Sequence, residues 1–166
     1  MSQVTEKLKY TDALADFVLA HGVSAASLRP MAKAAGTSDR MLVYHYGSKA
    51  GVIEAALREI ATRNMQDLEA ALPPKPLPAK DLMAVLGMVA QSGQFDPVYA
   101  VFFELAALAL RGDESAKSIG HAVATHFLDW TRVRLTEPER APELLAAVEG
   151  WGMLNGLGLD VPFPSG

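Results

Sequence analysis

The chain is 166 residues long, enough for one ordinary domain or for a small domain followed by a larger one. Its composition, 50% hydrophobic and 20% charged, is typical of a globular protein with a substantial core. The absence of cysteine excludes a disulfide framework and a thiolate metal site. Because there is no run of ~18 apolar residues and no signal-like N-terminus, the cytoplasm is the expected compartment.

The net charge of −4 is unevenly distributed along the chain. Residues 1–60 contain seven Lys or Arg and six Asp or Glu, a balance of +1. The remaining residues contain eight and thirteen, a balance of −5. Affinity for DNA depends on local phosphate contacts rather than on total charge. The composition is therefore compatible with a DNA-binding N-terminal part and an acidic body that faces away from DNA.

The N-terminal part predicts three helices and the start of a longer fourth one. The expected ranges, in chain order, are 5–21, about 28–35, 39 to about 45, and 48 to about 71. Gly22 ends the first helix, and Ser27 is a plausible N-cap for the second, with its hydroxyl accepting a backbone N–H. The second helix carries an apolar stripe at helical spacing, formed by Leu28, Met31, Ala32 and Ala35.

Residues 27–49 contain two short helices joined by a glycine-bearing turn, as in domains that insert one helix into the major groove of DNA. Gly36 falls where the chain must leave the first of these helices, and Thr37 or Ser38 can cap the second. On the second helix, Leu42 and Tyr46 share a face. The side chains directed elsewhere are those of Arg40, Val43 and Tyr44.

The remainder of the chain also predicts helices. Leu72 to Pro78 is a proline-rich break that cannot be helical, and the domain boundary is expected between Ile60 and this break. Helices are expected at 81–91, 97–110, 114 to about 136, and 141 to about 159. Because strand signals are nearly absent, the predicted class is all-α.

The helix-turn-helix segment resembles that of the tetracycline-repressor (TetR-type) regulators. The resemblance covers roughly residues 10–60, and the runs that carry it are Met31-Ala32, Ala35-Gly36-Thr37-Ser38, Leu42-Val43-Tyr44-His45-Tyr46 and Gly47-Ser48-Lys49. Three positions depart from the family pattern. Arg40 replaces a small residue, Val43 replaces a tyrosine, and Ala50-Gly51 stand where an acidic capping-box partner is usual.

The candidate DNA contacts come from this segment. Lys49, at a helix N-terminus, is suited to a phosphate contact, although an ordinary solvated lysine is the alternative. Arg40 suits a guanine edge, unless it pairs with Asp39 instead. The resemblance implies backbone contacts for Tyr44 and His45 and a core role for Tyr46. The full predicted set is Ser27, Arg29, Ser38, Arg40, Val43, Tyr44, His45 and Lys49.

The last two helices carry more apolar surface than a small domain readily hides, which indicates a partner. Four glycines between residues 150 and 158 lower helix propensity by up to ~1 kcal/mol each, so they suggest close helix approach. The resemblance implies that these helices pair with their copies in a homodimer. The expected interface residues are Phe127, Trp130, Leu145, Val148, Trp151 and Leu154.

The body also offers candidates for an effector pocket, although aromatic residues at helical spacing are more often plain core. Glu104 lies in an apolar run, where a carboxylate is costly to bury unless it is paired. It therefore meets either solvent at an edge or a polar group inside a pocket. The pocket residues considered are Tyr99, Phe102, Phe103, Glu104 and His121.

The resulting prediction is a two-domain, homodimeric transcriptional regulator. It comprises a helix-turn-helix DNA-binding domain (1–60) and a helical-bundle effector-binding and dimerisation domain (61–166). The resemblance implies a repressor released from a palindromic operator by a small-molecule effector. The alternatives are a helical ligand-binding dimer without DNA binding and an enzyme using the body as its pocket. No nucleophile–base pair, phosphate loop or metal-ligand cluster supports the enzyme, so no catalytic residue, metal or cofactor is predicted.

Overall fold

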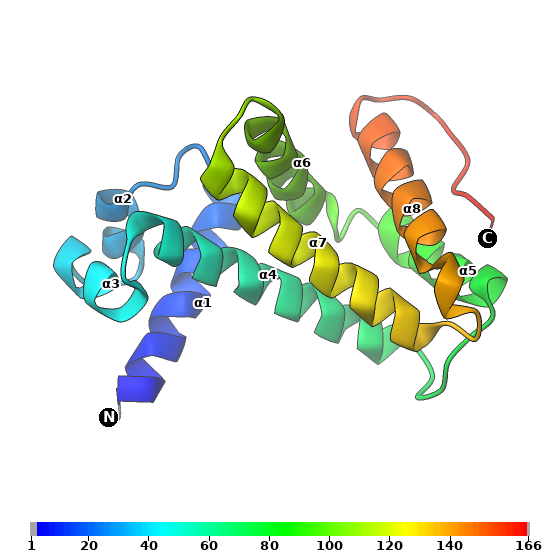
Figure 1. Cartoon of the computed structure of the whole chain (residues 1–166), viewed down its shortest axis with the longest axis horizontal. Coiled ribbons are helices and arrows are strands. Elements are labelled where there is room, and N and C mark those ends of the chain that lie inside the picture. The colour runs from blue at the N-terminus through cyan, green and yellow to red at the C-terminus, as the bar shows by residue number, and fades with distance from the viewer. Residues whose placement is uncertain (1–2, 166) are drawn as a thin grey trace. The chain divides into compact units, whose positions relative to one another are not determined.

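The computed structural model describes residues 3–165 of the chain, and the residues described are mainly helical (Figure 1). The helices are α1 (Gln3–His21), α2 (Leu28–Ala34), α3 (Asp39–Tyr46), α4 (Lys49–Ala71), α5 (Ala79–Gln91), α6 (Asp96–Leu110), α7 (Glu114–Arg134), a 3₁₀ turn (Pro138–Arg140) and α8 (Ala141–Gly156). The predicted all-α class is confirmed, and each predicted helix is present within three residues of its expected ends.

Two helices end earlier than predicted, for identifiable reasons. The N–H of Leu77 donates to the carbonyl of Arg134 at 2.8 Å, and the N–H of Thr136 donates to the carbonyl of Leu77 at 3.0 Å. This β-bridge between the proline-rich segment and the chain after α7 draws residues 135 and 136 out of the helix. The last helix closes when the N–H of Leu159 bonds back to the carbonyl of Leu154.

The chain divides into two compact units, residues 1–63 with 100–120 and residues 64–99 with 121–166. The predicted domain boundary after Ile60 stays a prediction, and these units differ from it because residues 100–120 group with the N-terminal segment. Three helices, α4, α6 and α7, run without interruption from one unit into the other. Within the described residues, no single helix has the length and apolar composition to cross a membrane, although the broken pair α5 and α6 meets those criteria jointly.

The first unit is built around the buried faces of its N-terminal helices. α2 packs against both α1 and α3. The fully buried side chains at the centre of this unit are Leu14, Val18, Met31, Leu42 and Val52. Met31 belongs to the apolar stripe predicted for α2, and Leu42 to the face that it was predicted to share with Tyr46 on α3.

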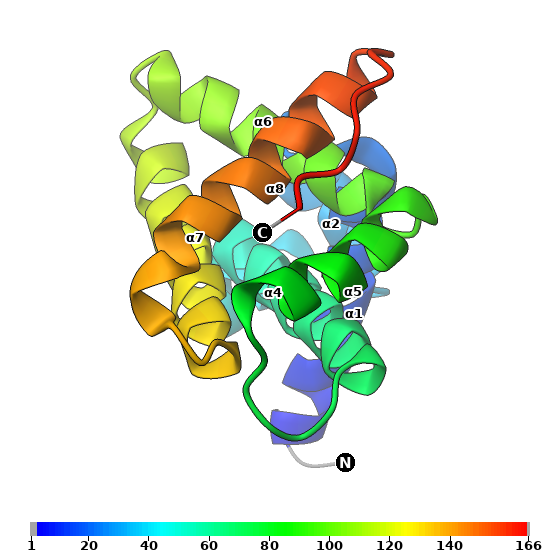
Figure 2. The ribbon, with the colours of Figure 1, turned by 90° about the vertical axis from the view of Figure 1, so that its right-hand side faces the viewer.

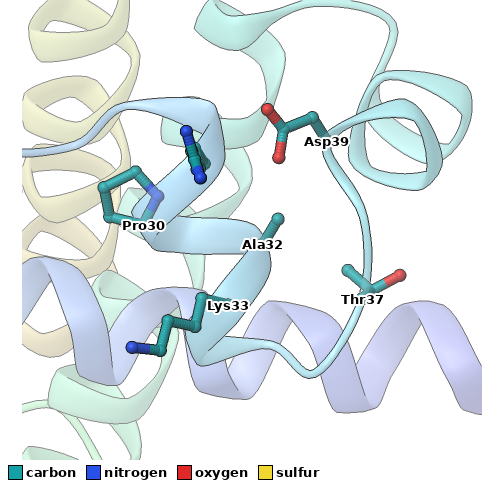
Figure 3. Close-up of a pocket in the computed structure, with 6 residues that line it drawn as sticks. Pro30, Ala32, Lys33, Thr37 and Asp39 are labelled. Atoms are coloured by element: carbon teal, nitrogen blue, oxygen red, sulfur yellow. The ribbon is translucent and has the colours of Figure 1, made fainter.

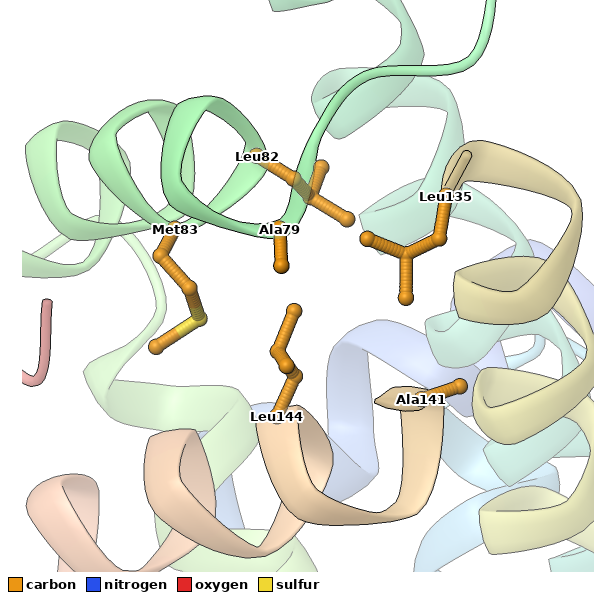
Figure 4. Packing of buried hydrophobic residues seen from close by; sticks show 6 residues of the cluster. All are labelled: Ala79, Leu82, Met83, Leu135, Ala141 and Leu144. Atoms are coloured by element: carbon orange, nitrogen blue, oxygen red, sulfur yellow. The ribbon is translucent and has the colours of Figure 1, made fainter. Parts of the chain in front are cut away.

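The second unit has its own apolar core between α5 and α8. Figure 4 shows the side chains that meet there, and these are Ala79, Leu82, Met83, Leu135, Ala141 and Leu144. A polar cluster joins α4 to α7 within the same unit. Glu69 accepts hydrogen bonds from the indole of Trp130 at 2.6 Å and from Nε of Arg134 at 2.8 Å, and it also forms an ion pair with Arg134.

The segment after α8 folds back onto the second unit (Figure 2). Phe163 packs against the apolar core and against Trp151, at 5.1 Å between ring centroids. The indole N–H of Trp151 donates to the carbonyl of Val161 at 3.1 Å. This tail therefore covers Trp151, which is only 7% exposed.

Gly152 is required by the contact between α8 and Tyr99 of α6. A Cβ at this position would lie 2.7 Å from Cε1 and 2.9 Å from Cδ1 of the Tyr99 ring. We therefore expect Gly152→Ala to destabilise the protein by about 1–3 kcal/mol, the usual range for overpacking. Gly150→Ala on the same helix is the matched control. A Cβ there meets nothing within 4 Å, so the substitution should stabilise α8 by up to ~1 kcal/mol. Urea unfolding of both variants tests this, and equal shifts would contradict it.

Candidate DNA-binding surface and effector site

The turn between α2 and α3 has the geometry that a helix-turn-helix unit requires. Gly36 adopts a φ of 64°, a left-handed conformation that glycine accepts without a steric penalty. The N–H of Thr37 donates to the carbonyl of Ala32 at 2.9 Å, which closes α2. The hydroxyl of Ser38 accepts the N–H of Met41 at 3.3 Å, so Ser38 caps α3 as one of the two predicted alternatives. The side-chain cap predicted for Ser27 is absent, because its hydroxyl accepts no such bond although Ser27 occupies the N-cap position.

One face of α3 holds the helix against the rest of the first unit. Leu42 is fully buried, and the hydroxyl of Tyr46 shares a hydrogen bond with that of Thr11 at 2.9 Å. Burial of Tyr46 raises the pKa of its phenol. The opposite face is left exposed, with Tyr44 68% and Val43 37% accessible. The helix therefore presents Tyr44 to solvent.

Seven of the eight predicted DNA contacts are exposed. These are Ser27, Arg29, Ser38, Arg40, Val43, Tyr44 and Lys49. In the described part of the chain no ion pair joins Arg40 to Asp39, so the guanidinium is not held by its neighbour. Exposed cations on two adjacent helices match the pattern of a phosphate-binding surface.

His45 differs from the other predicted contacts. Its ring lies 5.6 Å from that of Tyr10 and 5.2 Å from that of Tyr44, and its Nε2 is buried without a hydrogen-bond partner among the described residues. The buried Nε2 cannot reach a phosphate from this position. The predicted backbone contact of His45 therefore depends on Nδ1.

An open hollow of about 650 Å³ lies between α2 and α3 (Figure 3). It is lined by Arg29, Pro30, Ala32, Lys33, Thr37 and Asp39. Thr37 was expected only as a possible cap, and Lys33 was expected to add positive charge to this surface but is not in the set of eight predicted contacts. The sequence identifies Lys33 as a neighbour of Arg29, because the two cations are four residues apart and therefore share one exposed face of α2.

The start of α4 explains one departure from the family pattern. The hydroxyl of Ser48 accepts the N–H of Gly51 at 3.0 Å, which caps the helix without an acidic partner. A Cβ at Gly51 would overlap the carbonyl oxygen of Tyr46, so only glycine fits at this helix start. Because Gly51 of α4 approaches the last residue of α3 this closely, Lys49 lies next to the end of α3.

Glu104 has a role that the sequence did not reveal. Its two carboxylate oxygens accept the backbone N–H groups of Val23 at 2.6 Å and Ser24 at 2.7 Å. Gly22, with a φ of 81°, lets the loop approach, because a Cβ there would lie 2.6 Å from the carboxylate. Glu104 thus lies at a partly exposed edge, where its polar partners are the backbone of the loop between α1 and α2. Its assignment to an effector pocket stays a prediction.

The other pocket candidates are dispersed. Phe102 and Phe103 contact each other in the first unit, with ring centroids 6.3 Å apart. Tyr99 belongs to the second unit and packs on Gly152. His121 is exposed, which does not fit a residue lining a pocket within one chain. Glu149 on α8, which no sequence pattern singled out, has a buried carboxylate oxygen, and its charge acts on Tyr99.

The predicted dimer residues fall into three groups. Leu154 is 40% exposed, and other apolar side chains of the second unit are also accessible, namely Val133, Met153, Leu157 and Leu159. Phe127, Leu145 and Val148 are half-buried, and Trp130 is half-buried with its indole bonded to Glu69. Trp151 is covered by the chain's own tail, which corrects the expectation that it supplies free interface surface.

No protein-family model matches the sequence, and comparison with curated proteins finds no match. Solved structures do match over nearly the whole chain. A protein from Rhodococcus sp. assigned to the TetR family of transcriptional regulators is 18% identical with a TM-score of 0.71, covering 96% of this chain and 91% of its own. An assigned transcriptional regulator from Streptomyces coelicolor A3(2) is 18% identical with a TM-score of 0.73, at the same coverage of both chains. The multidrug-binding protein EbrR in complex with proflavin is 24% identical with a TM-score of 0.68, covering 96% and 93%. The chain therefore has the fold of these proteins.

Proposed function

We propose that this chain is a TetR-type transcriptional regulator that binds duplex DNA as a homodimer and is released from its operator by a small-molecule effector. The observation that carries the proposal is the exposed face of α3. Arg40 and Tyr44 are accessible there, while Leu42 and Tyr46 fix the helix from behind. Lys49, at the start of α4, is also exposed. Such a helix enters the major groove and reads base edges, with flanking contacts to phosphates.

The proposed dimer is supported by the geometry of DNA and by the surface of the second unit. Two reading helices must lie about one DNA turn (~34 Å) apart to bind a palindrome, which a single copy cannot achieve. The exposed apolar side chains of Val133, Leu154 and Leu157 supply surface for a second copy. A regulator of this kind acts on the chromosome, in the cytoplasm.

The effector role is supported by the fold shared with EbrR, a multidrug-binding protein solved with proflavin. We propose that a small molecule binds in the body and favours a conformation with lower DNA affinity, which is a population shift. Repression, rather than activation, is then the simplest outcome of operator occupancy.

The test is a selection of random duplex fragments retained by the purified protein at two salt concentrations. We expect a palindromic motif whose retention weakens as salt rises, because phosphate contacts release counterions. Salt-insensitive failure to enrich any motif would contradict the proposal and favour a ligand-binding dimer without DNA binding.

The selected duplex then tests the individual contacts. The double variant Tyr44→Ala, Lys49→Ala should lose at least about tenfold in affinity, and Lys49→Ala alone should reduce the salt slope by about one. Lys80→Ala, an exposed cation on α5, is the matched control. Affinity is measured by fluorescence anisotropy, with sedimentation to confirm an unchanged oligomer. Wild-type affinity in the double variant would show that α3 is not the reading helix.

A further inference from the structure

The tail after α8, residues 159–165, carries an aromatic residue between two prolines, in the run Val161-Pro162-Phe163-Pro164. A residue that precedes proline is restricted to extended backbone, so this run favours an extended segment. The structure agrees, because it assigns no helix or strand to the tail. Gly158, with a φ of 81°, turns the chain at the end of α8, and residues 153–160 are exposed. The tail therefore returns to the second unit through an exposed connection (Figure 2).

The ring of Phe163 lies over a glycine of α5. Gly87 is a buried residue inside this helix, and a Cβ there would lie 2.8 Å from Cδ1 and 3.1 Å from Cγ of Phe163. Alanine favours a helix more than glycine does, so glycine at this position weakens α5 itself. The absence of a side chain at Gly87 is what leaves room for the ring.

Trp151 of α8 makes two further contacts with the tail. Its indole N–H donates to the carbonyl of Val161 at 3.1 Å, and its ring meets the Phe163 ring edge to face at 5.1 Å between centroids. The buried apolar cluster between α5 and α8 completes the contact with Phe163. Aromatic surfaces with a polar group at one end are those on which proteins bind extended, proline-rich peptides. The tail thus lies on its own chain as a bound peptide does.

We propose that Gly87 and Trp151 form a docking site for a proline-flanked aromatic peptide, occupied in the isolated chain by its own tail, and that the tail of a second copy is the partner that this site fits. All the contacts come from one short stretch, so the same stretch of another copy supplies them equally. The exposed connection at residues 153–160 gives the tail freedom to exchange. Every contact lies within the second unit, so the inference does not depend on DNA binding.

Gly87→Ala tests the seat of the ring without weakening α5. The added methyl group would overlap the ring of the tail, so the tail should leave and Trp151 should lose its hydrogen-bond acceptor. The other tryptophan of the chain, Trp130, is bonded to α4 and serves as the internal reference. By NMR, the indole N–H of Trp151 should exchange at least tenfold faster than in wild type, while that of Trp130 is unchanged. Gly150→Ala, where a Cβ meets nothing within 4 Å, is the matched control. Unchanged exchange of both indoles in Gly87→Ala would overturn the proposal.

Phe163→Ala tests docking between molecules, because it leaves the site open and the tail without its ring. The probe is a fluorescein-labelled peptide with the sequence of residues 159–165, followed by anisotropy. We expect saturable binding to the full-length Phe163→Ala chain and no binding to Gly87→Ala. Wild type should bind at least tenfold more weakly than Phe163→Ala, because a tail on a short connection competes at about millimolar effective concentration. A peptide with alanine in place of its phenylalanine is the control. Equal binding of both peptides to Phe163→Ala, or binding of neither, would contradict the docking site.

A mixture of two full-length variants tests whether a second copy is the partner. Gly87→Ala has a free tail and a blocked site, whereas Phe163→Ala has an open site. When ¹⁵N-labelled Phe163→Ala is mixed with an excess of unlabelled Gly87→Ala, the Trp151 indole of the labelled chain should regain at least tenfold protection from exchange. Unlabelled Phe163→Ala should have no such effect. Peptide binding without this recovery would show that the tail of a second copy is not the partner.

Discussion

Glu149→Gln is expected to raise the free energy of unfolding at pH 8 by about 3 kcal/mol. Burial raises the pKa of the Glu149 carboxyl from 4.5 to about 7 in the folded chain. One pKa unit corresponds to about 1.4 kcal/mol, so forming the buried carboxylate costs roughly this amount at high pH. Glutamine has nearly the same shape and carries no charge, so it removes the penalty without opening a cavity.

The same substitution should change how stability depends on pH. Between about pH 4.5 and 7 the folded wild type binds a proton at Glu149 that the unfolded chain has released, so its stability falls as pH rises. Above about pH 7 the effect of Glu149 on the free energy of unfolding no longer changes with pH. The difference between Glu149→Gln and wild type should therefore be small near pH 4.5, grow up to about pH 7, and then level off.

Urea unfolding at pH 5 and pH 8 measures both effects, at fixed protein concentration because dimerisation adds to apparent stability. Glu143→Gln serves as the control on the same helix, since the Glu143 side chain is exposed and paired with Arg140. If wild type is more stable than Glu149→Gln at pH 8, the carboxylate has a cationic partner within the folded chain, which would contradict this prediction.

Glu104→Ala is expected to free the loop between α1 and α2 and to cost about 2 kcal/mol locally. Hydrogen bonds to a charged group contribute about 1.5–3 kcal/mol each, and the partial exposure of this carboxylate reduces that value. The N–H groups of Val23 and Ser24 would then be left without their acceptor. Their amide hydrogens should exchange at least tenfold faster, which hydrogen exchange detected by NMR measures directly.

The charge of Glu104 is part of this contact. Burial alone would raise the pKa of the carboxyl, but hydrogen bonds from Ser24 and Val23 lower it overall. The contribution of Glu104 to the free energy of unfolding is therefore complete above the ordinary pKa of a glutamate. It is lost as the pH falls through the lowered pKa of Glu104 in the folded chain. Glu104→Gln should retain part of the protection at Val23 and Ser24. Glu114→Ala, an exposed glutamate on α7, is the control, and unchanged exchange in Glu104→Ala would show that the contact is dispensable.

The elements of this fold could be predicted because their signals are local. Apolar residues at helical spacing and glycine or proline stops identified each helix, and the hydroxyl of Ser38 caps α3 as one of the two predicted alternatives. The contacts that position the site are not local. Glu104 bonds to the loop 80 residues earlier in the chain, and no pattern near either segment encodes that pairing. Glu149 was missed because it resembles any surface glutamate in sequence, and only the folded chain reveals the burial of its carboxylate.

The continuity of α4 limits how the length of this chain can change in evolution or by design. Each residue inserted into a helix rotates everything beyond it by 100°. One residue added between Val52 and Ile60 would turn Arg63 away from Asp12 and Asp16 if Val52 kept its buried position in the first unit. Insertions are therefore tolerated in the non-helical segment after Leu72, whereas α4 accepts only length changes that restore its phase, as seven or eleven residues do to within about 20°.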